Sequence, residues 1–163
     1  MKKLLFPLLI FPLVFCKAQT GFPKLTGHFG ILHPLLTFSD GSTSFNFNNS
    51  YTVGFPVGIN FWKTDKIGFS LEIVPLIKNE NGTHKVSNIM IHPGILYRFS
   101  PTFTFAGRAA FETNGRYGVT PIFNKVLKKN KLSNYYLAIP FPVRAGNDKP
   151  ISVTFGAQVG ISF

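Results

Sequence analysis

The strongest pattern in the sequence is the stretch Pro150-Ile-Ser-Val-Thr-Phe-Gly-Ala-Gln-Val-Gly-Ile-Ser-Phe163, in which two kinds of side chain alternate. One set is apolar: Ile151, Val153, Phe155, Ala157, Val159, Ile161 and Phe163. The positions between them are small or polar: Ser152, Thr154, Gly156, Gln158, Gly160 and Ser162. Because successive side chains of a β-strand point to opposite faces, the stretch predicts a strand with one apolar and one polar face. A strand of about this length can cross a bilayer at the tilt of a β-barrel.

The same period of two recurs through most of the chain. It is clearest in the segments 51–61, 67–77, 89–99, 103–111 and 135–143. Residues 24–37 form a less regular first segment, whose apolar side carries Leu25, Phe29, Ile31 and Leu35. Since no segment keeps a helical period, the sequence predicts an all-β protein.

The connections between these segments alternate in length. Lys63-Thr64-Asp65 and Ser100-Pro101 are short, whereas Ser39 to Asn49 and Asn79 to Lys85 are longer and rich in Ser, Asn and Gly. Short turns at one end and longer loops at the other are typical of outer-membrane barrels, in which the longer loops face outside.

The segment Tyr117 to Lys128 decides the number of strands. As a strand it pairs with the preceding segment through the turn Asn114-Gly115, a favoured hairpin dipeptide. As a loop it leaves seven strands. Because single-chain bacterial barrels have an even number of strands, we expect an eight-stranded antiparallel up-and-down transmembrane β-barrel.

Five charged residues of the predicted strands lie on the polar side of their strand. They are Glu72, Arg98, Arg108, Glu112 and Arg144. An Arg facing lipid at the bilayer midplane would cost about 2–4 kcal/mol, so we expect these side chains inside the barrel. There Glu72 could pair with Arg98 or Arg108, and Glu112 with Arg144, as a structural network, because buried charges need partners. A soluble lipocalin-type carrier would instead have apolar side chains inside.

Prolines are unusually frequent in the predicted strands. They are Pro34, Pro56, Pro75, Pro93, Pro121, Pro140 and Pro142. Proline has no N–H for the ladder, and a closed barrel has no edge at which to place it. We therefore expect β-bulges or local kinks at these positions.

The first 18 residues have the pattern of a secretory signal peptide. Lys2 and Lys3 precede the apolar run Leu4 to Phe15, and Cys16-Lys17-Ala18 offers a cleavage site. Cleavage would remove the only cysteine and leave a single barrel domain of residues 19–163. The expected location is therefore the outer membrane.

The chain is strongly basic, with 17 Lys and Arg against 6 Asp and Glu. For an exported protein we expect the partner of this charge to be anionic membrane lipid and not nucleic acid. The densest run, Lys125, Lys128, Lys129 and Lys131, is interpreted as an interfacial lipid anchor, with docking of a periplasmic partner as the alternative. The loop Ser39 to Asn49 is the longest candidate surface for an external partner.

The chain from about residue 20 onward resembles the small outer-membrane β-barrels of the OmpX or OmpA-transmembrane-domain kind, in a form common in Bacteroidota. The resemblance rests on the strand alternation, on Tyr136-Leu-Ala-Ile-Pro140 followed by Pro142-Val-Arg-Ala-Gly-Asn-Asp148, and on the terminal Ile161-Ser-Phe163. It implies recognition of the last strand, ending in Phe163, by the barrel assembly machinery. It also implies a structural or surface-binding role, with a lumen filled by side chains and no general porin activity.

Two alternatives carry a different chemistry. Barrels resembling lipid A deacylases place a Ser, a His and an acid on the lipid-facing outer rim, where His33 and Ser39 could lie here. No acidic residue is expected on an outward face to orient the histidine, so we expect no enzyme activity. The second alternative is a narrow small-solute transporter. The four histidines, His28, His33, His84 and His92, lack metal-ligand spacing, and we expect no cofactor.

Overall fold

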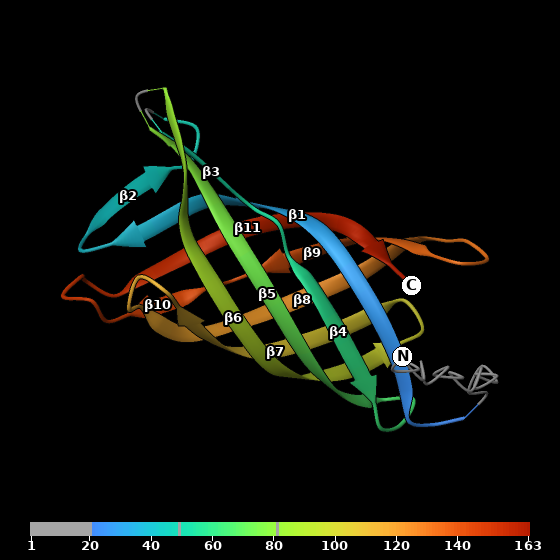
Figure 1. The fold of residues 1–163 in the computed structure, drawn as a ribbon. Helices are drawn as coiled ribbons and strands as arrows, with labels where there is room; N and C mark the ends of the chain where they lie inside the picture. Colours follow the sequence, from blue (N-terminus) through green and yellow to red (C-terminus); the bar gives the residue numbers. More distant parts are fainter. Residues whose placement is uncertain (1–20, 49, 81) are drawn as a thin grey trace, which may run out of the picture.

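A computed structural model describes residues 21–48, 50–80 and 82–163; the predicted signal peptide, residues 1–18, and the predicted domain start at residue 19 lie outside these ranges. The described chain is a single antiparallel sheet that closes on itself (Figure 1). Its strands are β1 (Lys24–Ser39), β2 (Ser42–Phe45), β3 (Ser50–Gly54), β4 (Val57–Trp62), β5 (Ile67–Glu80), β6 (Thr83–Ser100), β7 (Phe103–Glu112), β8 (Tyr117–Lys129), β9 (Asn134–Pro140), β10 (Val143–Ala145) and β11 (Ser152–Ser162).

The closed wall has eight strand positions, as predicted. β3 and β4 together form one strand of the wall, β9 and β10 form another, and β2 pairs only with β1. Closure comes from β1 and β11, which pair from His28↔Ser162 to Ser39↔Ser152. The segment Tyr117 to Lys128, which decides the number of strands, lies in the strand β8, which pairs with β7 through the Asn114-Gly115 turn, where Gly115 has a φ of 83°.

Burial follows the predicted period of two. In β5, Ile67, Phe69, Leu71 and Ile73 are exposed, and Gly68, Ser70, Glu72 and Val74 between them are buried. The apolar set of each strand therefore covers the outside of the barrel, and the polar or small set faces the interior.

Two proline positions interrupt the wall. The segments 51–61 and 135–143, predicted as continuous strands, each break at a Phe-Pro pair: Phe55-Pro56 and Phe141-Pro142. Another proline lies opposite each break, because the Phe55 N–H donates to the Pro75 carbonyl (3.0 Å) and the Phe141 N–H donates to the Pro121 carbonyl (2.9 Å). In an antiparallel sheet the N–H and C=O of one residue point to the same neighbouring strand. The positions where Pro75 and Pro121 lack an N–H therefore face the breaks at Phe55-Pro56 and Phe141-Pro142, where the neighbouring strand is already interrupted. The expected kinks are thus concentrated at two places.

A β-bulge changes the phase of β1. Its pairing with β11 runs Pro34↔Gly156 and then Leu36↔Phe155, which leaves Leu35 as the extra residue. Beyond it, Leu36 and Phe38 lie opposite outward residues, and Ser39 lies opposite the buried Ser152. Leu35 is thus the bulge residue itself, and beyond it the bulge places the even-numbered Leu36 and Phe38 on the apolar side.

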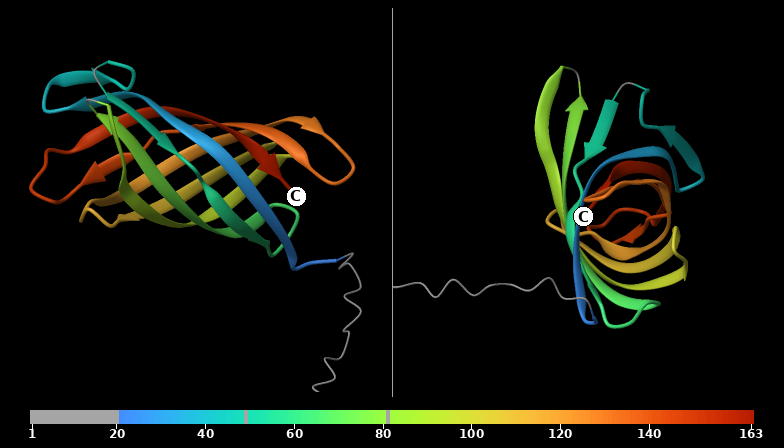
Figure 2. Two further views of the ribbon diagram at one scale, coloured as in Figure 1. Left: turned by 45° about the horizontal axis from the view of Figure 1, so that its top comes forward. Right: turned by 90° about the vertical axis from the view of Figure 1, so that its right-hand side faces the viewer.

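The two ends of the barrel differ. At one end, the short-turn end, lie the turns after Trp62, Ser100 and Lys129. At the other, the long-loop end, the expected loop Ser39 to Asn49 contains β2, and the expected loop Asn79 to Lys85 is largely strand, since the β5–β6 ladder continues to Glu80↔Thr83. Figure 2 shows this hairpin and the region of β2 and β3 projecting beyond the ring. Within the described ranges, no helix is both long and apolar enough to cross a membrane.

Candidate functional site

The barrel has an apolar outside and a polar inside. Large hydrophobic side chains are exposed on every strand of the wall, for example Leu25, Ile59, Ile95, Val119 and Val159. A soluble monomer rarely exposes a contiguous apolar patch of more than a few hundred Å². The outside therefore offers an apolar surface and few polar groups. The candidate site is the interior, where the buried charged residues lie.

Glu72 occupies the centre of the interior and is only 2 % exposed. Its Oε1 forms an ion pair with Arg108 Nη1, at 2.5 Å, and lies 3.1 Å from His92 Nδ1. Its Oε2 lies 2.9 Å from His28 Nε2. Arg108 also donates from Nη2 to Ser70 Oγ at 3.0 Å. A buried carboxylate is thus surrounded by three side chains that can donate hydrogen bonds.

Two cross-strand rows bring these side chains together. One row runs His28↔Gly58↔Glu72↔His92 across β1, β4, β5 and β6. The other runs Ser70↔Gly94↔Arg108↔Thr120 across β5, β6, β7 and β8.

Each row contains a glycine under a large side chain. A Cβ at Gly58 would lie 2.5 Å from the His28 ring, and one at Gly94 would lie 2.5 Å from Arg108 Cγ. The absence of these two side chains therefore lets His28 pass over β4 and Arg108 pass over β6 to reach Glu72 on β5.

A second polar cluster lies toward the long-loop end. Arg144 donates from Nε to Glu112 Oε1 at 2.7 Å, and Asn88 donates from Nδ2 to Glu112 Oε2 at 2.6 Å. Arg144 also donates to the carbonyl of Val119 at 3.0 Å. A cluster of Leu32, Val74, Met90 and Ala110 separates this region from the Glu72 network.

Arg98, which was also predicted as a partner of Glu72, has different neighbours. The Arg98 guanidinium stacks 3.8 Å from the centre of the Trp62 ring and donates to the Asp65 carbonyl at 3.2 Å. Arg98 therefore lies near the short-turn end, and Arg108 is the partner of Glu72.

The histidines show no metal-ligand spacing in the sequence, but His28 and His92 are both buried in the interior of the barrel. Both contact Glu72, and His92 Nε2 also lies 2.9 Å from Thr120 Oγ1. The short turn after Trp62 fixes the register of β4 and β5 and places Gly58 opposite Glu72. This one pairing of the row could therefore be predicted from the sequence. Within the described part of the chain, no group of His, Cys, Asp and Glu side chains is arranged to hold a metal ion.

The lumen contains two separate cavities. One, of about 530 Å³, reaches from the short-turn end to Glu72, and the other, of about 740 Å³, lies at the long-loop end. They share no lining residue, and Val74, His92 and Thr120 line neither. Side chains therefore fill the lumen at mid-height, whereas the prediction filled it throughout.

The outer-rim residues weighed for lipid chemistry lie apart. His33 faces outward, where its Nδ1 lies 3.0 Å from the Tyr51 hydroxyl and its ring lies beside Phe47. Ser39 lies on the opposite face because of the bulge at Leu35, and its hydroxyl donates to the Ile151 carbonyl. The pairing of His33 with Ser39 thus has no support in the geometry.

Neither a protein-family profile nor a curated protein matches the sequence. Two solved structures resemble the chain, and both are designed proteins. One is the solution NMR structure of the de novo designed TMB2.3, at 12 % identity, with a TM-score of 0.47 over 89 % of this chain and 96 % of that one. The other comes from a study described as de novo design of transmembrane β-barrels, at 10 % identity, with a TM-score of 0.46 over 85 % of this chain and 92 % of that one.

Proposed function

We propose that the chain is an integral outer-membrane β-barrel of the small OmpX or OmpA-transmembrane kind, with a structural or surface-binding role. The observation that carries the proposal is the division of side chains by the wall. Ionised groups such as Glu72 and Arg108 are buried inside, and apolar side chains are exposed outside. That division suits a wall whose outer solvent is lipid.

Aromatic side chains support the same placement. At the short-turn end Phe61, Phe99 and Tyr135 are exposed on the outside, and at the long-loop end Phe111 and Tyr117 are. Aromatic girdles occupy the two interfaces of membrane barrels, so outer-membrane lipids are the expected partners along the wall. We expect the barrel assembly machinery to recognise β11 together with Phe163, which follows it.

The projections at the long-loop end are the expected surface for external partners. The segment from Ser39 to Asn48 exposes Phe45 and Phe47, and the β5–β6 hairpin carries Lys78, Glu80 and Lys85 beyond the ring. Apolar rings beside charged strands are suited to a protein partner. Solute passage is not proposed, because the layer of Val74, His92 and Thr120 lies between the two cavities.

Cell fractionation with surface labelling tests the location and the orientation. In a Gram-negative host, the full chain is expected to stay in the membrane fraction after a carbonate wash. A Thr83→Cys variant, in the long-loop hairpin, is expected to react with an impermeant maleimide on intact cells. The matched variant Thr64→Cys, in a short turn, is expected to react only after the outer membrane is permeabilised.

Release of the chain by carbonate would contradict an integral barrel. Labelling of Thr64→Cys on intact cells, with Thr83→Cys protected, would contradict the orientation.

A further inference from the structure

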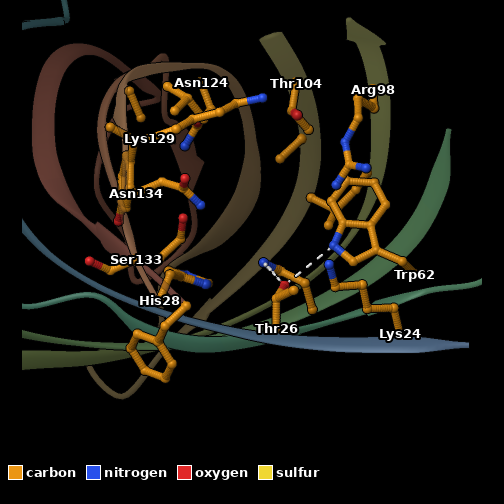
Figure 3. Close-up of a pocket in the computed structure, with 18 of the residues that line it drawn as sticks. Lys24, Thr26, His28, Trp62, Arg98, Thr104, Asn124, Lys129, Ser133 and Asn134 are labelled. Carbon is orange, nitrogen blue, oxygen red and sulfur yellow. Dashed lines mark hydrogen bonds between the residues drawn. The ribbon is translucent and has the colours of Figure 1, made fainter. Parts of the chain in front are cut away.

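The cavity at the short-turn end has a strongly basic lining. Lys24, Arg98, Lys129 and Lys131 border it, and Figure 3 shows Lys24, Arg98 and Lys129 around the space. The only acidic lining residue is Glu72, which Arg108 already pairs. The lining side chains therefore carry an excess of positive charge, which favours an anion within the cavity.

Buried polar atoms beside this cavity lack a partner. His28 is 6 % exposed and Arg108 is 7 % exposed, and both line the cavity. His28 Nδ1 and Arg108 Nε have no hydrogen-bond partner among the described residues, and neither has Asn60 Oδ1. Leaving such an atom unsatisfied costs about 1–3 kcal/mol, so a side-chain rearrangement that brings a hydrogen-bonding group to these atoms would be favourable.

The remaining wall offers neutral hydrogen-bonding groups, and the ring of Trp62 packs beside them. Its amide and hydroxyl groups come from Thr26, Asn60, Thr104, Asn124, Asn134 and Gln158. Trp62 donates from Nε1 to Thr26 Oγ1 at 3.3 Å, which fixes its ring against the cavity (Figure 3). Amides and hydroxyls can together donate to and accept from the hydroxyl groups of a polyol.

We propose that this cavity binds a small hydroxylated oxyanion of the sugar-phosphate class. Its volume of about 530 Å³ lies within the range of small-molecule sites. The phosphate would lie between the basic side chains Lys24, Arg98 and Lys129, and the hydroxyl groups would contact the amides deeper in the lumen. Side chains at mid-height close the cavity, so the ligand enters and leaves by the short-turn end.

The chain carries a reporter at this site, because Trp62 is its only tryptophan. The protein is refolded in zwitterionic detergent and titrated with glucose 6-phosphate, with glucose and with inorganic phosphate. Glucose 6-phosphate is expected to change the Trp62 fluorescence saturably, inorganic phosphate to bind more weakly, and glucose to cause no change. The three probes separate the contribution of the charge from that of the hydroxyl groups.

A pair of matched double variants locates the binding. Lys24→Gln with Lys129→Gln is expected to raise the Kd for glucose 6-phosphate about tenfold or more, because charge-assisted hydrogen bonds are lost. Lys85→Gln with Lys149→Gln removes the same charge from the other cavity and is expected to leave the Kd unchanged. Both pairs keep Trp62 and Arg98 in place, and heat-dependent gel mobility checks that each barrel is folded.

Three results would overturn the assignment. They are no saturable change with glucose 6-phosphate, an equal loss of affinity in both double variants, and equal affinity for glucose and glucose 6-phosphate. Equal affinity for inorganic phosphate and glucose 6-phosphate would overturn the hydroxylated part of the ligand.

Discussion

Arg108→Met is expected to lower the free energy of unfolding of the refolded barrel by about 3–5 kcal/mol. Arg108 and Glu72 are both buried and in direct contact at mid-height of the lumen. Methionine keeps much of the side-chain volume but removes the positive charge. The Glu72 carboxylate would then remain buried with only its histidine contacts. A buried charge that has lost its partner is strongly destabilising.

Denaturant unfolding in detergent or lipid vesicles measures this loss. The double variant Glu72→Gln with Arg108→Met is expected to recover more than half of it, because no uncompensated charge remains. Lys78→Met removes one partner of the exposed pair Lys78–Glu80, whose N···O distance is 3.0 Å, and is expected to cost less than about 1 kcal/mol. Equal costs for Arg108→Met and Lys78→Met would contradict a buried network that stabilises the barrel.

Leu71→Arg is expected to lower the free energy of unfolding in lipid vesicles by about 2–4 kcal/mol. Leu71 points outward from β5, next to Glu72 and opposite Ile59 and Pro93, near mid-height of the wall. An arginine there would lie in the hydrocarbon layer, far from either interface.

Tyr117→Arg is the matched control for Leu71→Arg. Tyr117 also faces outward but lies at the long-loop end, where an arginine reaches the interface and is expected to cost about 0–1 kcal/mol. Equal and small costs at both positions would indicate a water-exposed wall and contradict the membrane placement.

The architecture was largely predictable because the strands have a simple period. Residues 67–77 and 150–163 keep one apolar face throughout, and the structure forms one wall strand from each. The phase change in β1 was not predictable, because Pro34, Leu35 and Leu36 are consecutive apolar residues that fit either face. The breaks at Pro56 and Pro142 could not be predicted either, because the alternation of apolar and polar residues continues on both sides of each proline.

The interior was predictable only in part. Depth along neighbouring strands offered Arg108 as one of two partners for Glu72, because β5, β6 and β7 follow one another along the chain and pair in that order. The contact between His28 and Glu72 depends instead on β1 pairing with β4 across the long connection from Ser39 to Asn49. No turn in the sequence sets that register, so His28 could not be assigned from the sequence.

A residue-by-residue scan of β5 in lipid vesicles tests the two-faced wall most directly. Spin labels are attached to single cysteines at positions 68, 69, 70, 71, 73 and 74 of the chain lacking Cys16, and their accessibility to oxygen and to a water-soluble nickel complex is measured. We predict high oxygen accessibility at Phe69, Leu71 and Ile73 and low values at Gly68, Ser70 and Val74, since only the first set faces outward. Uniform accessibility along β5, or high oxygen accessibility at positions 68, 70 and 74 instead, would contradict the account.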